Sequence, residues 1–275
     1  MTKPFSDPQS RAGARPPILD QKDPSSPSVF QPAALLREAR RQKVLPVVEV
    51  PAVCILDPDG DIVRRLRMGG RSKPFEGWPC YHTQLDAFEL AGQSVGIVGC
   101  AVGAPFAVLI AEQLFASGCR LLLSLTSAGQ IVPAGPTPYF VIIDRALRDE
   151  GTSYHYLPGS TFAEAPDRSL LDRVERAGRA LPDITLHRGA TWTTDAPYRE
   201  TEAAIARARD LGTLAVEMEA AALYAFSTTS GSSVVCFAHV TNSMAQTEGD
   251  FEKGEADGAK ATLAVAAAAA RGWRA

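Results

Sequence analysis

The sequence has few cysteines, and their spacing excludes two common uses of this residue. The 275 residues include Cys54, Cys80, Cys100, Cys119 and Cys236, and no two of these form a CxxC pair. The number is odd, and most of the five lie in apolar surroundings. This pattern argues against a disulfide scaffold and against a zinc site, so we expect no bound metal and a reducing compartment.

The chain also lacks a strong charge bias and a long apolar run. Its formal net charge is −3, with 21% charged residues, so we expect neither nucleic acid nor an anionic membrane as a partner. No apolar run reaches the roughly 18 residues that a membrane helix needs, and the N-terminal residues contain no signal-peptide core. Together with the cysteine usage, these absences predict a cytoplasmic protein.

Residues 1–32 differ in composition from the rest of the chain. They are rich in proline and serine and contain few large apolar side chains. Alone, such a segment cannot bury enough surface to offset its ordering entropy. Two outcomes stay open for this N-terminal arm: a disordered tail, or a segment that packs on the body or on a neighbouring subunit. Residues 33–275 have the apolar content and the length of one globular domain.

Strand-like and helical segments alternate from residue 33 onward. Short apolar runs typical of strands occupy residues 44–56, 94–100, 120–125, 139–144, 183–192, 214–218 and 232–240. Helical patterns occupy residues 33–42, 104–118, 167–181, 199–212, 219–231 and 252–273. This alternation predicts an α/β domain whose sheet is covered by helices on both faces.

Two glycine-containing turns follow strands. Residues 96–105 (GIVGCAVGAP) lead from a strand into a helix, where backbone N–H groups can approach an anion. Their spacing differs from the dinucleotide fingerprint, and a plain tight turn is an equal alternative. Residues 124–131 (SLTSAGQI) carry Thr126 and Ser127, whose hydroxyls can bind a ligand or their own turn.

A third segment is more informative. In LAVEMEAAALYAF (214–226), Glu217, Met218 and Glu219 interrupt an apolar run where a buried strand becomes a helix. Carboxylates at that place either cap the helix or hold two vicinal hydroxyls in a crevice at the strand ends. The methionine can pack on the apolar face of a sugar.

These motifs together resemble the nucleoside phosphorylase superfamily, which includes uridine phosphorylases, hexameric purine nucleoside phosphorylases and methylthioadenosine/adenosylhomocysteine nucleosidases. VEMEAAALYAF is similar to the family signature, and the two glycine turns have the family's order and spacing. RALRDEGTSYHYLP (145–158) and GATWTTDAPYRET (189–201) resemble the uridine phosphorylase segment and the base-pocket loop. The resemblance implies one α/β domain with a central mixed β-sheet flanked by helices. It also implies a homo-oligomer (dimer, trimer or hexamer) with no cofactor, and inorganic phosphate as a candidate co-substrate.

The resemblance assigns roles to individual residues. It places Glu219 on the ribose 2′ and 3′ hydroxyls, with Met218 beneath the sugar, Glu217 adjacent and His155 at the 5′ end. It places five side chains around the nucleobase: Trp192, Asp195, Tyr198, Arg199 and Asn242. It places five turn residues on the side of the attacking phosphate or water: Gly99, Gly103, Thr126, Ser127 and Gly129. Of all these, Glu219 and Asn242 are the expected catalytic residues.

The nucleophile is where the sequence departs from its relatives. Ser124 stands where the phosphorylases carry a phosphate-binding arginine, and Arg64 and Arg65 match a second one only after a shift. Phosphorolysis of a purine nucleoside or uridine is the leading expectation. Hydrolysis by water is the alternative, with a carboxylate from the acidic stretch 57–61 as base. A nucleoside-binding protein without activity is a third reading. Asn242 cannot transfer a proton and favours a 6-oxopurine.

Overall fold

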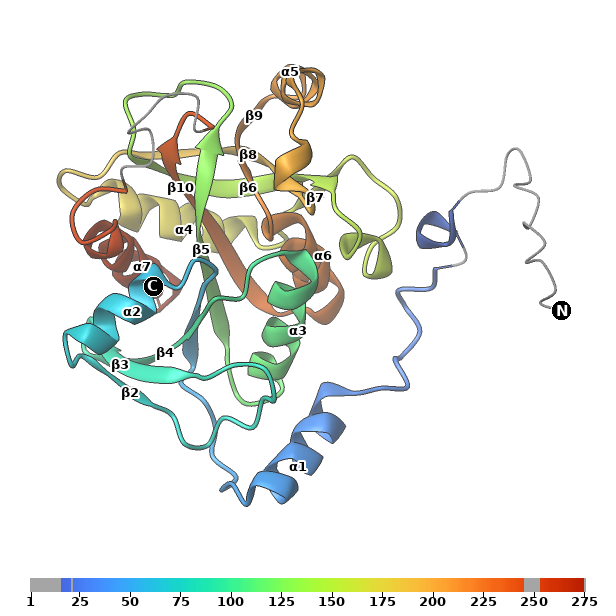
Figure 1. The fold of residues 1–275 in the computed structure, drawn as a ribbon, viewed down its shortest axis with the longest axis vertical. Coiled ribbons are helices and arrows are strands. Elements are labelled where there is room, and N and C mark those ends of the chain that lie inside the picture. Colours follow the sequence, from blue (N-terminus) through green and yellow to red (C-terminus); the bar gives the residue numbers. More distant parts are fainter. Residues whose placement is uncertain (1–15, 21, 245–252, 275) are drawn as a thin grey trace, which may run out of the picture.

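A ten-stranded mixed β-sheet forms the centre of the computed structural model, which describes residues 16–20, 22–244 and 253–274 (Figure 1). The strands are β1 (Val53–Asp57), β2 (Ser72–Pro74), β3 (Asp86–Leu90), β4 (Gln93–Gly99), β5 (Leu121–Gln130), β6 (Tyr139–Asp149), β7 (Phe162–Glu164), β8 (Leu186–Thr194), β9 (Thr213–Glu217) and β10 (Ser233–Asn242). Their order is β10-β6-β8-β9-β5-β1-β4-β3-β2, with β7 beside β6. The predicted α/β domain with a mixed sheet is confirmed.

Five of the strands close on themselves. β10 pairs with β5 on one side and with β6 on the other, and β9 joins β5 to β8. β6 and β8 pair in parallel and complete the ring. Beyond β5, strands β1 and β4 run parallel to it, as does β10. The carboxyl ends of β1, β4, β5 and β10 therefore meet at one edge, where ligands of open α/β sheets usually bind.

Helices cover both faces of the sheet. They are α1 (Pro32–Lys43), α2 (Asp61–Met68), α3 (Ala104–Phe115), α4 (Arg168–Arg179), α5 (Glu202–Asp210), α6 (Ala220–Ser230) and α7 (Ala259–Arg274), with short 3-10 turns η1 (Pro17–Leu19), η2 (Ser153–His155) and η3 (Pro197–Arg199). α3 and α6 lie on one side, and α2, α4 and α7 on the other (Figure 1). Within the described residues, no helix is long and apolar enough to span a membrane.

Local chemistry fixes the two helices nearest the predicted site. α3 starts after Gly103, whose φ of +91 suits glycine, and carries a proline in its first turn. α6 ends at Gly231 in the left-handed conformation, a common helix stop. Between these ends, the Tyr224 hydroxyl donates to the Ile143 carbonyl (2.6 Å) and accepts from the Cys236 N–H (3.1 Å). These two bonds anchor α6 to β6 and β10.

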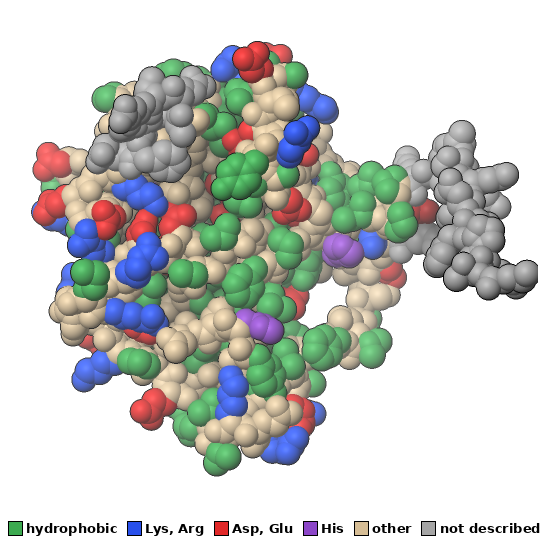
Figure 2. Space-filling model, in the orientation of Figure 1, with side chains coloured by type: hydrophobic (Ala, Val, Ile, Leu, Met, Phe, Trp, Pro, Cys, Tyr) green, Lys and Arg blue, Asp and Glu red, His purple; other side chains and the backbone are tan. Residues whose placement is uncertain are grey.

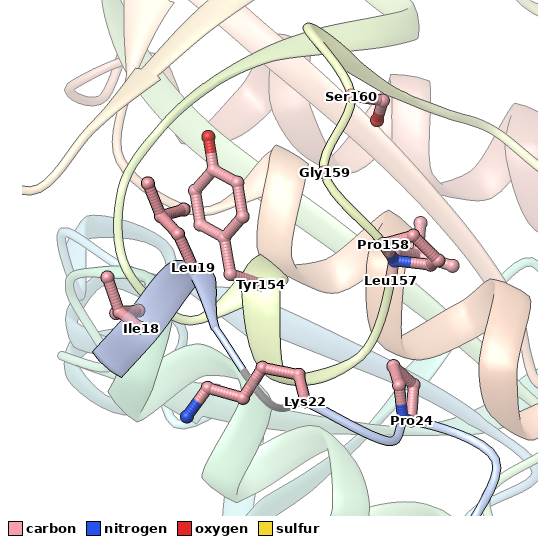
Figure 3. Close-up of a pocket in the computed structure, with 9 residues that line it drawn as sticks. All are labelled: Ile18, Leu19, Lys22, Pro24, Tyr154, Leu157, Pro158, Gly159 and Ser160. Atoms are coloured by element: carbon pink, nitrogen blue, oxygen red, sulfur yellow. The ribbon is translucent and has the colours of Figure 1, made fainter. Parts of the chain in front are cut away.

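The described part of the N-terminal arm contacts the body through η1. Ile18 and Leu19 lie against the loop that contains η2, with Leu19 beside the Tyr154 ring, around a cavity of about 590 Å³ (Figure 3). In the space-filling view, an opening separates the next part of the arm from the body (Figure 2). The boundary between arm and domain stays a prediction, and residues 1–15 lie outside the described residues.

Candidate functional site

Glu217 is buried at the end of β9, and all its hydrogen-bonding capacity is used inside the protein. One carboxylate oxygen accepts from the hydroxyls of Thr191 (3.1 Å) and Thr193. The other accepts from the backbone N–H groups of Glu219 and Ala220, both at 2.7 Å. A carboxylate held by the first N–H groups of α6 stabilises the helix start. The predicted contact of Glu217 with ribose therefore stays a prediction, and its visible role is to cap α6.

Glu219, unlike Glu217, uses only part of its hydrogen-bonding capacity within the described residues. It is 1% exposed, and its Oε1 accepts from the Gly103 N–H at 2.7 Å. Its Oε2 is buried and accepts no hydrogen bond among the described residues, because the nearby Thr126 hydroxyl donates to the Ser127 carbonyl (3.2 Å). Buried polar atoms are usually satisfied, and the exceptions often mark a ligand position. Glu219 thus presents one unused oxygen at the carboxyl edge of the sheet.

The pKa values of the two buried carboxyl groups, Glu217 and Glu219, are both raised. Burial raises the pKa of Glu217, against four hydrogen bonds that favour its ionised form. Burial and the nearby Glu217 carboxylate raise the pKa of Glu219 to about 8. In the free protein at neutral pH, Glu219 is therefore mostly protonated. A neutral Glu219 can both donate to and accept from a sugar hydroxyl.

Packing explains two of the glycines assigned to the nucleophile side. A side chain at Gly99 would overlap Val63 at the start of α2. A Cβ at Gly129 would lie 2.5 Å from the Met244 sulfur. Gly103 differs, because its N–H directly holds Glu219. The close packing at Gly99 and Gly129 gives structural reasons for both glycines, and their contact with a nucleophile stays a prediction.

Three aspartates follow β1 and surround a small cavity. Asp57 is 2% exposed and accepts from the Val63 N–H (2.9 Å). Burial, together with the charges of Asp59 and Asp61, raises the pKa of Asp57 to about 7. Asp59 accepts from the Ser127 N–H (3.3 Å) and from the Lys253 ammonium group (3.1 Å). Lys253 also pairs with Asp61. The acidic stretch 57–61 therefore forms a hydrogen-bonded cluster in which Asp57 titrates near neutral pH.

The cavity has a volume of about 20 Å³. It is lined by Asp57, Asp59, Asp61, Ile62, Leu125, Thr126, Ser127, His239, Lys253, Asp257 and Thr262. That volume holds about one water molecule. Thr126 lies between this cavity and Glu219, because it lines the cavity and its hydroxyl is close enough to lower the pKa of Glu219. We call it the inner cavity.

The inner cavity has a lysine where phosphate binding would call for arginines. Among the residues that the structure describes, no arginine lines it. Arg64 pairs with Asp61, and Arg65 pairs with Asp257. Lys253 is itself neutralised by Asp59 and Asp61. The sequence did not single out Lys253 or His239. The one available signal was a histidine inside the apolar run 232–240.

Asn242, which the sequence predicts to contact the base, ends β10 and is 5% exposed. Its Oδ1 accepts from the Met244 N–H (2.9 Å), and its Nδ2 donates to the Thr241 hydroxyl (3.2 Å). The carbonyl oxygen is thus used by the turn that follows the strand. The amide still has a second N–H to donate, so contact with a base stays a prediction.

The other predicted base residues make contacts of their own within the protein or are exposed. Trp192 is 3% exposed, packs with Ile131, Ala208 and Val216, and donates to Asp149 (3.0 Å). Trp192 also lines a cavity of about 350 Å³ together with Ala204 and Arg207 of α5, and its stacking on a base stays a prediction.

Three further predicted residues are exposed, namely Asp195, Tyr198 and Arg199. Asp195 accepts from the Gly151 N–H (2.9 Å), which ties two loops together, and Tyr198 is 99% exposed. His155 is also exposed, on η2. Their contacts with a nucleoside stay predictions, and Met218 remains half-buried next to Glu219.

Comparisons with known proteins agree with this architecture. The chain is 29% identical over 123 residues to an uncharacterized protein of Acanthamoeba polyphaga mimivirus (45% of this chain, 46% of that protein). It is 28% identical over 138 residues to a DeoD-type purine nucleoside phosphorylase of Streptococcus pyogenes (50% and 58%), and 30% identical over 134 residues to that of Bacillus cereus (48% and 57%). The chain spans about half the length of the curated relatives it matches.

Solved structures extend the comparison to most of the fold. A uridine phosphorylase from Vibrio fischeri, complexed with 6-hydroxy-1-naphthoic acid, superposes with a TM-score of 0.69 at 19% identity, covering 83% of this chain and 97% of that one. A second structure of that enzyme gives a TM-score of 0.68 and covers 82% and 95%. At this identity the likeness concerns the fold. A family model described as the phosphorylase superfamily matches residues 52–274, and the chain therefore belongs to the phosphorylase superfamily.

Proposed function

We propose that the protein cleaves the N-glycosidic bond of a ribonucleoside, with water as the nucleophile. The observation that carries the proposal is the pair formed by Glu219, with its unused buried oxygen, and the inner cavity, which has room for one water beside Asp57. Membership of the phosphorylase superfamily supports the substrate class. The names of the purine nucleoside and uridine phosphorylases among its relatives support it as well.

Glu219 is the proposed ribose ligand. Its Oε2 would exchange hydrogen bonds with the 2′ and 3′ hydroxyls, while the Gly103 N–H holds the other oxygen in place. Met218 would pack against the sugar. Because Glu217 is anchored by four donors, the strand-to-helix junction keeps Glu219 in one orientation. Such preorganised positioning lowers the barrier without reorganisation during the reaction.

Asp57 is the proposed general base. The water oxygen bonds to C1′ as the C1′–N bond breaks, and that bonding pair leaves with the base nitrogen. One water proton passes to the Asp57 carboxylate, and the departing base takes up a proton from solvent. The products are free ribose and free base. A base with a pKa of about 7 matches neutral conditions, where it is ionised often enough and still accepts a proton readily.

Phosphorolysis is the second candidate, and the names of the relatives favour it. Its difficulty here is charge. Transferring a phosphate near two negative charges out of water is costly unless paired cations receive it. Asp59 already accepts from the Ser127 N–H, and Lys253 is neutralised by two carboxylates. Phosphate binding would need the ion pairs of Lys253 with Asp59 and Asp61 to break and the inner cavity to expand.

Release of free base from a panel of purine and pyrimidine nucleosides tests the proposal. Assays run in phosphate-free buffer, with Glu219→Gln as the matched inactive control. We expect release in that buffer with free ribose as co-product, and we expect a 6-oxopurine among the best substrates if Asn242 donates to the base. Release that requires phosphate would favour the second candidate. Binding without release under both conditions would favour a nucleoside-binding protein.

A further inference from the structure

His239, on β10, is a buried histidine that the proposed reaction does not use. It is 6% exposed, and its ring stacks on Phe140 with centroids 4.3 Å apart and planes 3° from parallel. Gly258 is also close, since an added Cβ there would be 2.6 Å from the His239 Cε1 atom. The ring is thus packed against Phe140 and near the backbone of Gly258.

The ring nitrogens of His239 make no hydrogen bond among the described residues, although the side chain is buried. Burial and the nearby Lys253 charge lower the pKa of His239 to about 4, so the ring is neutral near pH 7. A neutral imidazole has one N–H donor and one acceptor nitrogen, and both capacities are unused here. Both nitrogens can therefore exchange hydrogen bonds with water in the adjoining space.

His239 and Lys253 line two cavities at once. One is the inner cavity of about 20 Å³ next to Asp57. The other, which we call the outer cavity, has a volume of about 500 Å³ and lies between Pro138, Pro182 and the first turns of α7, including Ala264. His239 and Lys253 are thus common to the linings of the two cavities, and we call these two residues the shared wall.

Charge in this wall is balanced. The Lys253 ammonium group is paired with Asp59 and Asp61, and Lys260 at the outer cavity is paired with Glu255 (2.9 Å). A wall with neutralised cations and a neutral imidazole suits an uncharged polar molecule better than a dianion. The shared wall therefore matches water in charge, and the inner cavity matches it in volume.

We propose that the outer cavity is the entrance for the nucleophile and that the His239 ring is its size filter, admitting water and excluding larger nucleophiles. The inference rests on the proposed hydrolysis. Water would pass the ring by exchanging hydrogen bonds with its nitrogens and then reach Asp57. The nucleoside would occupy the opposite, Glu219 side of the inner cavity.

Methanol is the probe, because it differs from water by one methyl group. If methanol reaches the inner cavity, its oxygen bonds to C1′ as the C1′–N bond breaks, and its hydroxyl proton passes to Asp57. The products are methyl riboside and free base. The ratio of methyl riboside to ribose, measured by chromatography in water–methanol mixtures, therefore reports the size of nucleophile that enters.

His239→Ala removes the ring from the wall. We expect the methyl riboside to ribose ratio to rise by about tenfold, the scale on which a cavity discriminates one methyl group. His239→Phe restores the volume without the nitrogens, so it should keep the low ratio and turn over more slowly. His187→Ala is the matched control, because the His187 ring also packs on an aromatic ring (Tyr139, 5.2 Å) and lines neither cavity. It should leave the ratio unchanged.

Ala264→Phe tests the entrance from the other end and carries the test if His239→Ala fails to fold. Filling the outer cavity should lower kcat several-fold and leave the KM for the nucleoside unchanged. A wild-type ratio in folded His239→Ala, or a wild-type kcat in Ala264→Phe, would overturn the inference while hydrolysis itself stands. If the wild-type protein releases no base without phosphate, the proposed function fails instead.

Discussion

One carboxylate oxygen of Glu219 accepts a 2.7 Å hydrogen bond from the Gly103 N–H, and its other oxygen has no partner among the described residues. The bond joins the β9–α6 junction to the β4–α3 turn, 116 residues apart in sequence. Glu219 is thereby fixed by the backbone of a second loop while one oxygen stays available. The central claim, that water from the inner cavity attacks a ribosyl group held by Glu219, depends on this arrangement.

Glu219→Gln should lower kcat/KM by about 100-fold or more, the scale seen when one preorganised polar group is removed from an active site. The amide can still accept from Gly103, so the fold should be retained. Steady-state kinetics and circular dichroism on the same preparation check both statements. A folded variant with near-normal turnover would remove Glu219 from the site.

Glu217→Gln should instead damage stability. An amide has only one acceptor oxygen, whereas the Glu217 carboxylate serves four donors around the start of α6. Leaving buried donors unpaired costs about 2–4 kcal/mol in all. Urea unfolding measures the change, with Glu219→Gln as the matched control. An unfolding free energy equal to that of the wild type would show that the cap is dispensable.

The activity should depend on pH through Asp57. Its pKa of about 7 means that the ionised base becomes more abundant as pH rises from about 6 to 8, so kcat/KM should rise over that range. Asp57→Asn should abolish most turnover and remove this rise. A wild-type profile that is flat between pH 6 and 8 would count against Asp57 as the base.

The same group should influence stability with the opposite sign. The pKa of Asp57 is higher in the folded protein than its ordinary value of 3.8, so the folded state favours the protonated carboxyl. Its contribution to stability is present at low pH and is lost as pH rises through about 7. Relative to the wild type, Asp57→Asn should therefore become more stable as pH rises from about 4 to 8. A constant difference in unfolding free energy would contradict this.

Deleting residues 1–30 should lower the melting temperature by several degrees, because it removes the contacts of Ile18 and Leu19 with the η2 loop. Deleting residues 1–15 alone is the matched control, since it leaves η1 in place. Size-exclusion chromatography on both proteins tests whether the arm also contributes to the predicted homo-oligomer. Identical melting temperatures for the full chain and both deletions would show that the packing of η1 adds nothing.

The alternation of strands and helices could be predicted because the long elements have strong patterns. Helix α3 and strand β10 fall within one to three residues of the expected ranges 104–118 and 232–240. α2 was missed, because it directly follows a turn rich in aspartate and glycine and buries only Ile62, Val63 and Leu66. The short strands β2 and β3 were missed as well, since they have only three and five residues and carry little apolar pattern.

The site could be predicted in part. A carboxylate in an apolar junction identified Glu219, because burying such a group requires a reason that the sequence makes visible. The different roles of Glu217 and Glu219 could not be separated, since they depend on which donors the fold brings near each. Lys253 and Asp59 are 194 residues apart in sequence. They meet because α7, which follows Lys253, packs beside α2, which follows Asp59. His239 looks like an ordinary strand residue until the two cavities beside it are known.

The most direct test of the central claim is the rate of base release as a function of phosphate concentration, with the sugar product identified by mass spectrometry. Starting from phosphate-free buffer and the best nucleoside of the panel, the account predicts a rate that does not change with added phosphate and yields free ribose. A rate that rises from zero and saturates with phosphate, yielding ribose 1-phosphate, would contradict it.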